Sequence, residues 1–274
     1  MPDLHWTIPV ARWSSWPAAA SAAPDIGFIE PIVRRRLSTL SRVALKVAHE
    51  CVAQNEARVV FASRHGELRR TTDILRAISA GEPVSPTAFS LSVLNAMTGV
   101  FGIARGDRSA ASAISAGAET LGYALLEAHA QYAAQPGAPV LLVYADEPAD
   151  AAYGTIEDEV QGGALAILLD STVANGTLTC TVTGGAAQTP AMNDRQAAST
   201  PGSAAVTAAT QVPGATQVPS ATPAASVATE TTAASAASFA TQSQALQHCL
   251  ETGHASVWHN AGATWHWSWH ALAA

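Results

Sequence analysis

The fold is decided by three consecutive runs: ASAIS (111–115), AETLGYALLEAHAQYAA (118–134) and VLLVY (140–144). The two outer runs are short and largely apolar, which predicts strands, whereas the middle run has the length and composition of a helix. Two more apolar runs, 164–169 and 177–182, predict further strands downstream. Continuous apolar strands that alternate with helices indicate a sheet covered on both faces, so we expect a layered α/β fold.

The residues upstream of these runs extend the same alternation. Apolar residues recur every three or four positions over 38–52, which predicts a helix with one buried face. A short strand is predicted at 58–62 and a second helix at 67–80. Residues 88–103 are apolar almost all round and include two glycines. Because helical glycines cost stability relative to alanine, we expect a helix there that packs closely against a neighbouring backbone.

The composition changes abruptly after the last predicted strand. Residues 185–240 consist mostly of Ala, Thr, Ser, Pro, Val and Gln, with only three charged residues. Such a segment cannot bury enough apolar surface to offset its ordering entropy, so we predict a disordered linker. Ordered structure is then predicted to resume with a helix at 242–251 and a strand at 264–270. One face of that strand carries alternating tryptophans and is predicted to be buried, namely Trp265, Trp267 and Trp269.

Composition excludes several classes of protein. The chain has 274 residues, of which 48% are apolar and 13% charged, and this balance points to extensive buried surface or a partner. Its apolar runs are far shorter than the ~20 residues that a membrane span needs, and the N-terminus lacks a signal-peptide pattern. Three cysteines form neither a metal-binding spacing nor an even disulfide set: Cys51, Cys180 and Cys249. We therefore expect a soluble cytoplasmic protein with reduced thiols.

The net charge of −7 is unevenly distributed along the chain. Residues 1–110 hold 13 Lys and Arg against 9 Asp and Glu, a balance of +4. Residues 111–274 hold 1 against 12, a balance of −11. A nucleic-acid-binding protein usually has a denser basic stripe, so we expect no nucleic-acid partner. The basic half is either a solvated surface or a binding surface for an acidic partner.

The sequence predicts neither a metal site nor a nucleotide site. Four histidines gather near the C-terminus, but His266 and His270 lie four residues apart on the predicted strand. That spacing separates them by ~13 Å, which is too far for one shared ion. The chain also lacks a P-loop motif and has no GxGxxG motif after a strand. We therefore expect no metal and no cofactor.

Residues 113–120 are the most informative segment for chemistry. Here a predicted strand is followed by small residues and then by a helix, which permits a sharp elbow at the helix N-terminus, where backbone amides stabilise negative charge. The tip of the elbow is Gly117, which has no side chain to attack a substrate. The alternative is a serine enzyme with Ser112 or Ser115 as the nucleophile and His65 as the base, although no GxSxG motif is present.

Five motifs occur in an order that is informative as a whole. They are RRRLS (34–38), FASRHGEL (61–68), SPTAFSLSVLNA (85–96), the elbow (113–120) and LLVYADE (141–147). This order resembles the N-terminal half of β-ketoacyl synthases. More narrowly, the chain is similar to the short chain length factors of aryl polyene and related type II fatty-acid-like pathways. The resemblance covers roughly residues 25–184 and implies a thiolase-like fold, in which helices cover a mixed sheet.

Composition and the resemblance together indicate how the chain divides, and the resemblance implies what the chain lacks. Residues 1–184 correspond to the synthase-like domain, 185–240 to the linker, and 241–274 to a helix and a Trp-rich strand that pack back on the domain. In active synthases the elbow holds a cysteine that accepts the acyl chain, and here that position is Gly117. Active synthases also use two histidines from their C-terminal half, for which this chain has no matching region.

These expectations point to a catalytically silent subunit. It would pair with an active ketosynthase and help to shape the tunnel for the growing acyl or polyene chain. The candidate partner or tunnel residues are Phe89, Asn95, Met97, Gly99 and Phe101.

An acyl carrier protein is the second expected partner, and its candidate docking residues are Arg34, Arg35, Arg36 and Arg42. Two alternatives stay open. One is a stand-alone thioesterase or acyltransferase that uses the serines near the elbow. The other is a carrier-docking module with no role in a tunnel.

Overall fold

The computed structural model describes residues 3–20, 22–52, 56–184, 239–260 and 262–272. All of these residues belong to one compact unit. The segment predicted to be a linker lies outside the described residues, except for its last two positions. No helix among the described residues is long and apolar enough to cross a membrane.

The unit is built on one eight-stranded mixed sheet, whose strand order is β3-β2-β4-β5-β1-β6-β8-β7. Strand β2 pairs in parallel with both β3 and β4, and all other neighbours pair antiparallel. The strands are β1 (Leu4–Trp16), β2 (Arg58–Ala62), β3 (Ala111–Ile114), β4 (Val140–Asp146), β5 (Gly163–Leu169), β6 (Gly176–Gly184), β7 (Ser256–Asn260) and β8 (Ala263–Ala271).

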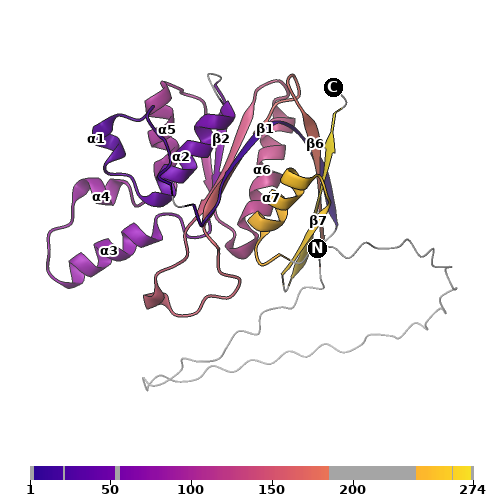
Figure 1. The fold of residues 1–274 in the computed structure, drawn as a ribbon. Coiled ribbons are helices and arrows are strands. Elements are labelled where there is room, and N and C mark those ends of the chain that lie inside the picture. Colours follow the sequence, from indigo (N-terminus) through magenta and orange to yellow (C-terminus); the bar gives the residue numbers. More distant parts are fainter. Residues whose placement is uncertain (1–2, 21, 53–55, 185–238, 261, 273–274) are drawn as a thin grey trace, which may run out of the picture. The chain divides into compact units, whose positions relative to one another are not determined.

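Helices cover both faces of this sheet, as the continuous apolar strands predict (Figure 1). Helix α2 packs on β1, β4 and β5 on one face, whereas α6 and α7 pack on the other. The helices are α1 (Pro31–Arg34), α2 (Thr39–Val52), α3 (Leu68–Ser79), α4 (Pro86–Ser90), α5 (Ala96–Arg105), α6 (Thr120–Ala134) and α7 (Gln242–Thr252). Short 3₁₀ turns at Gly117–Glu119 and Ala151–Tyr153 complete the description.

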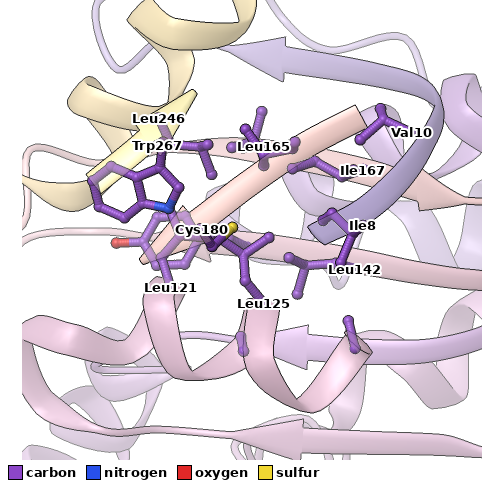
Figure 2. Packing of buried hydrophobic residues seen from close by; sticks show 14 of the residues in the cluster. Ile8, Val10, Leu121, Leu125, Leu142, Leu165, Ile167, Cys180, Leu246 and Trp267 are labelled. Atoms are coloured by element: carbon purple, nitrogen blue, oxygen red, sulfur yellow. The ribbon is translucent and has the colours of Figure 1, made fainter. Parts of the chain in front are cut away.

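Two hydrophobic cores result from the alternation of side chains along each strand. In β2, for example, Val60 belongs to the core under α6 and Phe61 to the core under α2. Figure 2 shows the first core, where Leu121 and Leu125 of α6 face residues of the sheet such as Leu142. The sheet therefore lies between the two cores.

The C-terminal segment completes the first core. Strand β8 pairs with β6 over the whole length of β6, and β7 forms the outer edge. The alternation of tryptophans predicted one buried face, and the structure confirms it. Trp265 and Trp267 are fully buried, and Trp269 packs against the same core.

Two predictions of secondary structure need correction. The apolar segment 88–103 is not one helix, because α4 ends at Ser90 and α5 begins at Ala96. The hydroxyl groups of Ser90 and Ser92 donate to backbone carbonyls three residues earlier, and such bonds compete with helix continuation. Strands β1 and β7 have no counterpart in the prediction, although in β1 Trp6, Ile8 and Val10 alternate with more exposed residues.

Candidate functional site

Three parallel strands place their loops at one end of the sheet. Strands β3, β2 and β4 lie side by side and run in the same direction, so their C-terminal ends lie together at one end of the sheet. In open α/β sheets, ligands bind beyond the C-terminal ends of the strands. The residues gathered there are Ser63–Gly66 after β2, Ser115–Thr120 after β3 and Asp146 at the end of β4. We call this group the elbow site.

Asp146 holds the elbow site together from its centre. The carboxylate is fully buried, and its Oδ1 accepts hydrogen bonds from Ser63 Oγ (2.7 Å) and the His65 backbone N (3.0 Å). Its Oδ2 accepts one from the Arg64 backbone N at 2.8 Å. Burial raises the pKa of Asp146 above its ordinary value, although these hydrogen bonds act in the opposite direction.

The elbow itself is fixed by short polar contacts. Ser115 Oγ donates to the Arg64 carbonyl at 3.0 Å, which joins the loops after β3 and β2. Thr120 Oγ1 accepts from the Ala116 backbone N at 2.9 Å and donates to the Gly117 carbonyl at 2.7 Å. The turn that precedes α6 is therefore closed by the first residue of that helix.

Gly117 begins the short 3₁₀ turn between β3 and α6, which is the segment that the sequence predicts to be an elbow. Its φ of +60° is in the left-handed region that favours glycine. A Cβ atom placed there would meet no other atom within 4 Å. The tip thus faces open space, but it carries no group that attacks a substrate.

The residues of the serine alternative are not brought together. Ser115 donates its hydroxyl to the Arg64 carbonyl, and Ser112 accepts a bond from Gln131 at 3.2 Å. His65 Nε2 instead pairs with Glu159 Oε1 at 2.7 Å. In the part of the chain that the structure describes, no hydrogen bond links either serine to His65. A nucleophile and its base need that contact, so the geometry does not favour a serine enzyme.

A strap between β4 and β5, residues 147–162, lies against the elbow site. The Arg64 guanidinium donates to the carbonyls of Glu157 (2.9 Å) and Asp158, and His65 binds Glu159. Burial raises the pKa of Glu159, but the bonds from His65 and from the Val160 N–H outweigh it and leave this pKa below its ordinary value. The side chains of Arg64 and His65 therefore hold the strap against the turn after β2.

An apolar groove begins beside the elbow and follows α6. It has a volume of about 550 Å³ and is lined mainly by Ile114 and Ala116 on one side and by Tyr123, Leu126 and Ala130 of α6 on the other. Strand β3 borders this groove and is one of the two edge strands of the described sheet. An edge strand presents unpaired N–H and C=O groups, which makes this part of the surface suited to a protein partner.

The residues predicted to meet a partner divide into two groups. Phe89 is 65% exposed, and Asn95 and Gly99 are exposed as well. Met97 and Phe101 are only 1% and 2% exposed, because they fill the core under α2. The last two side chains are thus core residues, and a contact with a partner would fall to the first three.

The predicted carrier-docking arginines also differ in what they contact. Arg42 donates to the carbonyls of Leu37 (3.2 Å) and Arg34 (2.9 Å), so its guanidinium holds the end of α1 in place. Arg35 and Arg36 are exposed, and Arg34 is half-buried. Arg42 therefore has a structural task, whereas Arg35 and Arg36 present their charge to solvent.

The C-terminal histidines lie apart from the elbow site, on β7, β8 and the turn that precedes them. His259, His266 and His270 are exposed. Among the described residues, no group of three or more His, Cys, Asp or Glu side chains is placed to hold a metal ion.

Sequence reasoning missed the central role of Asp146. Its signal was an acidic residue at the end of an otherwise apolar strand, in the LLVYADE motif. Nothing in that motif shows that its partners lie about eighty residues earlier in the chain, in the turn after β2.

A comparison with protein-family models identifies the fold family. The model described as β-ketoacyl synthase, N-terminal domain, matches residues 11–217, which is more than half of the chain. The chain belongs to this family. The predicted thiolase-like fold is confirmed, with its mixed sheet covered by helices. No curated protein matches the sequence.

One solved structure shares this fold over nearly the whole chain, and others are similar over part of it. A chain of the complex between the ketosynthase ApeO and its chain length factor ApeC from Xenorhabdus doucetiae has a TM-score of 0.67 at 20% identity. The match covers 96% of this chain and 99% of that one. The ishigamide ketosynthase/chain length factor has a TM-score of 0.47 at 18% identity, with 60% and 62% covered. A β-ketoacyl synthase from Burkholderia phymatum has a TM-score of 0.48 at 12% identity, with 59% and 50% covered.

Proposed function

We propose that this ketosynthase-family protein is a non-catalytic subunit, a chain length factor, that pairs with an active ketosynthase. In that pair it helps to shape the tunnel in which an acyl or polyene chain grows. The observation that carries the proposal is Gly117 at the open tip of the elbow. A condensing enzyme needs a thiolate there for its covalent intermediate, and glycine supplies none.

The length of the matched structure supports the same assignment. The match to the chain from the ApeO/ApeC complex covers 96% of this chain and 99% of that chain. The two chains therefore have nearly the same length. That complex contains a ketosynthase and its chain length factor. A synthase-like chain of this size therefore has a precedent in a structure where a ketosynthase and such a subunit occur together.

The groove and the strand beside it favour a protein partner on the β3 side. Strand β3 is only partly covered, and Ile114 and Leu126 expose part of their apolar surface along the groove. Phe89 and Val93, around the end of α4, add further exposed apolar surface. An obligate interface commonly buries ~2,000 Å² or more and is hydrophobic, which agrees with a pair formed through this surface.

An acyl carrier protein is the second partner in this proposal. Carrier proteins of this kind are acidic, and the exposed guanidinium groups of Arg35 and Arg36 supply the complementary charge. Such rim charges act mainly on the association rate and its salt dependence. Arg42 is left out of this surface because the carbonyl groups around α1 already occupy it.

Co-expression with a cognate ketosynthase tests the pairing directly. We expect the two proteins to elute together from a size-exclusion column at micromolar concentration. Leu126→Glu places a charge in the groove and should separate them, whereas Val173→Glu, at an exposed apolar residue between β5 and β6, should not. Elution of both wild-type proteins as separate monomers would overturn the proposal.

A further inference from the structure

The N-terminus of α6 is occupied by a side chain from the far end of the sequence. Oε1 of Gln242, the first residue of α7, accepts a hydrogen bond from the backbone N of Gly122 at 2.8 Å. Gly122 is the third residue of α6, so its N–H has no acceptor within the helix. Gln242 is only 3% exposed and thus caps α6 from inside the core.

Trp265 of β8 packs against the same residue of α6, Gly122. Its ring lies so close to Gly122 that a Cβ atom there would be 2.4 Å from the ring. The ring also packs edge-on against Tyr123, with centroids 5.3 Å apart. Ser256 Oγ, at the start of β7, donates to the Ala245 carbonyl of α7 at 2.7 Å. Helix α7 therefore packs against β7, and the start of α6 is one of the places where the C-terminal segment contacts the rest of the protein.

From these contacts we infer that the C-terminal segment is an internal cap that suppresses anion stabilisation at the elbow. The first turn of a helix carries a partial positive charge on its free N–H groups. At this elbow the Gly122 N–H is bound by Gln242 and the Ala116 N–H by Thr120. The amide oxygen of Gln242 brings partial negative charge to a helix end that would otherwise stabilise a thiolate or an oxyanion.

This inference rests on the proposed function, since it gives the silent elbow a second cause. The first cause is the missing nucleophile at Gly117. The second is that the chain itself satisfies donors at the start of the helix. Restoring a thiol at position 117 should therefore produce a weakly activated group, and Gln242 is the positioning residue that limits it.

The test uses the full-length protein with Gly117→Cys as a reporter. The thiol pKa is read from the rate of alkylation by iodoacetamide as a function of pH. Adding Gln242→Ala removes the cap, and we expect the pKa of the reporter thiol to fall by about half a pH unit. Adding Gln242→Glu brings a carboxylate to the same place, and we expect a rise of similar size. A purely structural role for Gln242 would not move this pKa in opposite directions.

Gln247→Ala is the matched control. Gln247 lies on the same helix and donates to Glu251, away from α6, so the pKa of the reporter thiol should stay unchanged. A second readout is deuterium uptake across 117–123, which should be faster with Gln242→Ala than with Gln247→Ala. The inference is overturned if the thiol pKa is the same with Gln242→Ala, Gln242→Glu and Gln247→Ala. If the reporter thiol does not react, equal deuterium uptake with Gln242→Ala and Gln247→Ala overturns it instead.

Co-elution with the ketosynthase is scored separately on the same variants. If the proteins do not pair but the pKa of the reporter thiol shifts as expected, the proposed function is rejected and the inference about the cap stands. Intact pairing with no shift in the thiol pKa rejects the cap alone.

Discussion

The indole ring of Trp265 occupies the space where residue 122 would carry a side chain. A Cβ atom at Gly122 would lie 2.4 Å from this ring, which is closer than real Cβ contacts permit. Helix α6 and strand β8 are therefore fitted to each other through a glycine and a tryptophan. This pair fixes how the C-terminal segment closes the core.

Gly122→Ala should displace Trp265 and destabilise the protein. Overpacking a filled core typically costs about 1–3 kcal/mol, which outweighs the gain of about 1 kcal/mol that alanine brings to a helix. Urea denaturation followed by tryptophan fluorescence measures the difference. Gly99→Ala is the control, because a Cβ atom in that helical position meets nothing within 4 Å. Equal stability of the two variants would contradict the described packing.

Asp146→Asn should loosen the elbow site. The carboxylate accepts through both oxygens, and an amide keeps only one acceptor while its NH₂ group faces a backbone donor. A buried donor left without a partner costs about 1–3 kcal/mol, measured as a lower free energy of unfolding. Asp170→Asn is the matched control. Both hydrogen bonds from Thr172 reach the same oxygen of Asp170, and the amide oxygen of asparagine can accept both of them. The prediction fails if both variants lose the same stability.

The link between His65 and Glu159 should make the strap sensitive to acid. The pKa of Glu159 lies below its ordinary value of 4.5 in the folded protein, so its stabilising contribution is present at neutral pH and is lost as the pH falls through the lowered pKa. Glu159→Gln should increase deuterium uptake of residues 147–162 at pH 7. The difference from the wild type should vanish in acid. Glu157→Gln should behave like the wild type, because Arg64 binds the carbonyl of that residue and not its side chain.

Gly117→Cys should create the one reactive thiol of the folded protein without creating condensing activity. Burial raises the pKa of Cys51 to about 12 and that of Cys249 to about 11, and it raises the pKa of Cys180 as well. Iodoacetamide at pH 8 should therefore modify only the introduced thiol, as mass spectrometry of peptides would show. Condensation should stay absent, because the proposed function assigns this chain no counterpart of the two histidines that active synthases use, and nucleophile and base act as a unit. An inert introduced thiol would mean that position 117 is not the tip of the elbow.

The sequence predicts those parts of the fold whose signal is local. The strand at 58–62 and the start of the strand at 140 follow from unbroken apolar runs, and both agree with the structure. The elbow tip at Gly117 is equally local, because small residues separate a strand from a helix there. The division of 88–103 into two helices depends on serine hydroxyls that compete for backbone carbonyls, and composition does not reveal that competition.

Other features depend on partners that are distant in the sequence. Gln242 caps a helix that begins 122 residues earlier, at Thr120, and no pattern near either residue shows this. Met97 and Phe101 are large apolar residues of the kind found at protein interfaces, yet they fill the core. Which side of α5 packs against α2 is decided by tertiary contacts that the local sequence does not show.

The most direct test of the account is an assay of condensation by the reconstituted pair. This chain alone, the ketosynthase alone and the two together are supplied with acyl and malonyl carrier protein, and the products are identified by mass spectrometry. The account predicts full activity only for the pair, and loss of that activity when the ketosynthase's own nucleophilic cysteine is replaced by alanine. Condensation by this chain alone, or by the pair after that replacement, would contradict it.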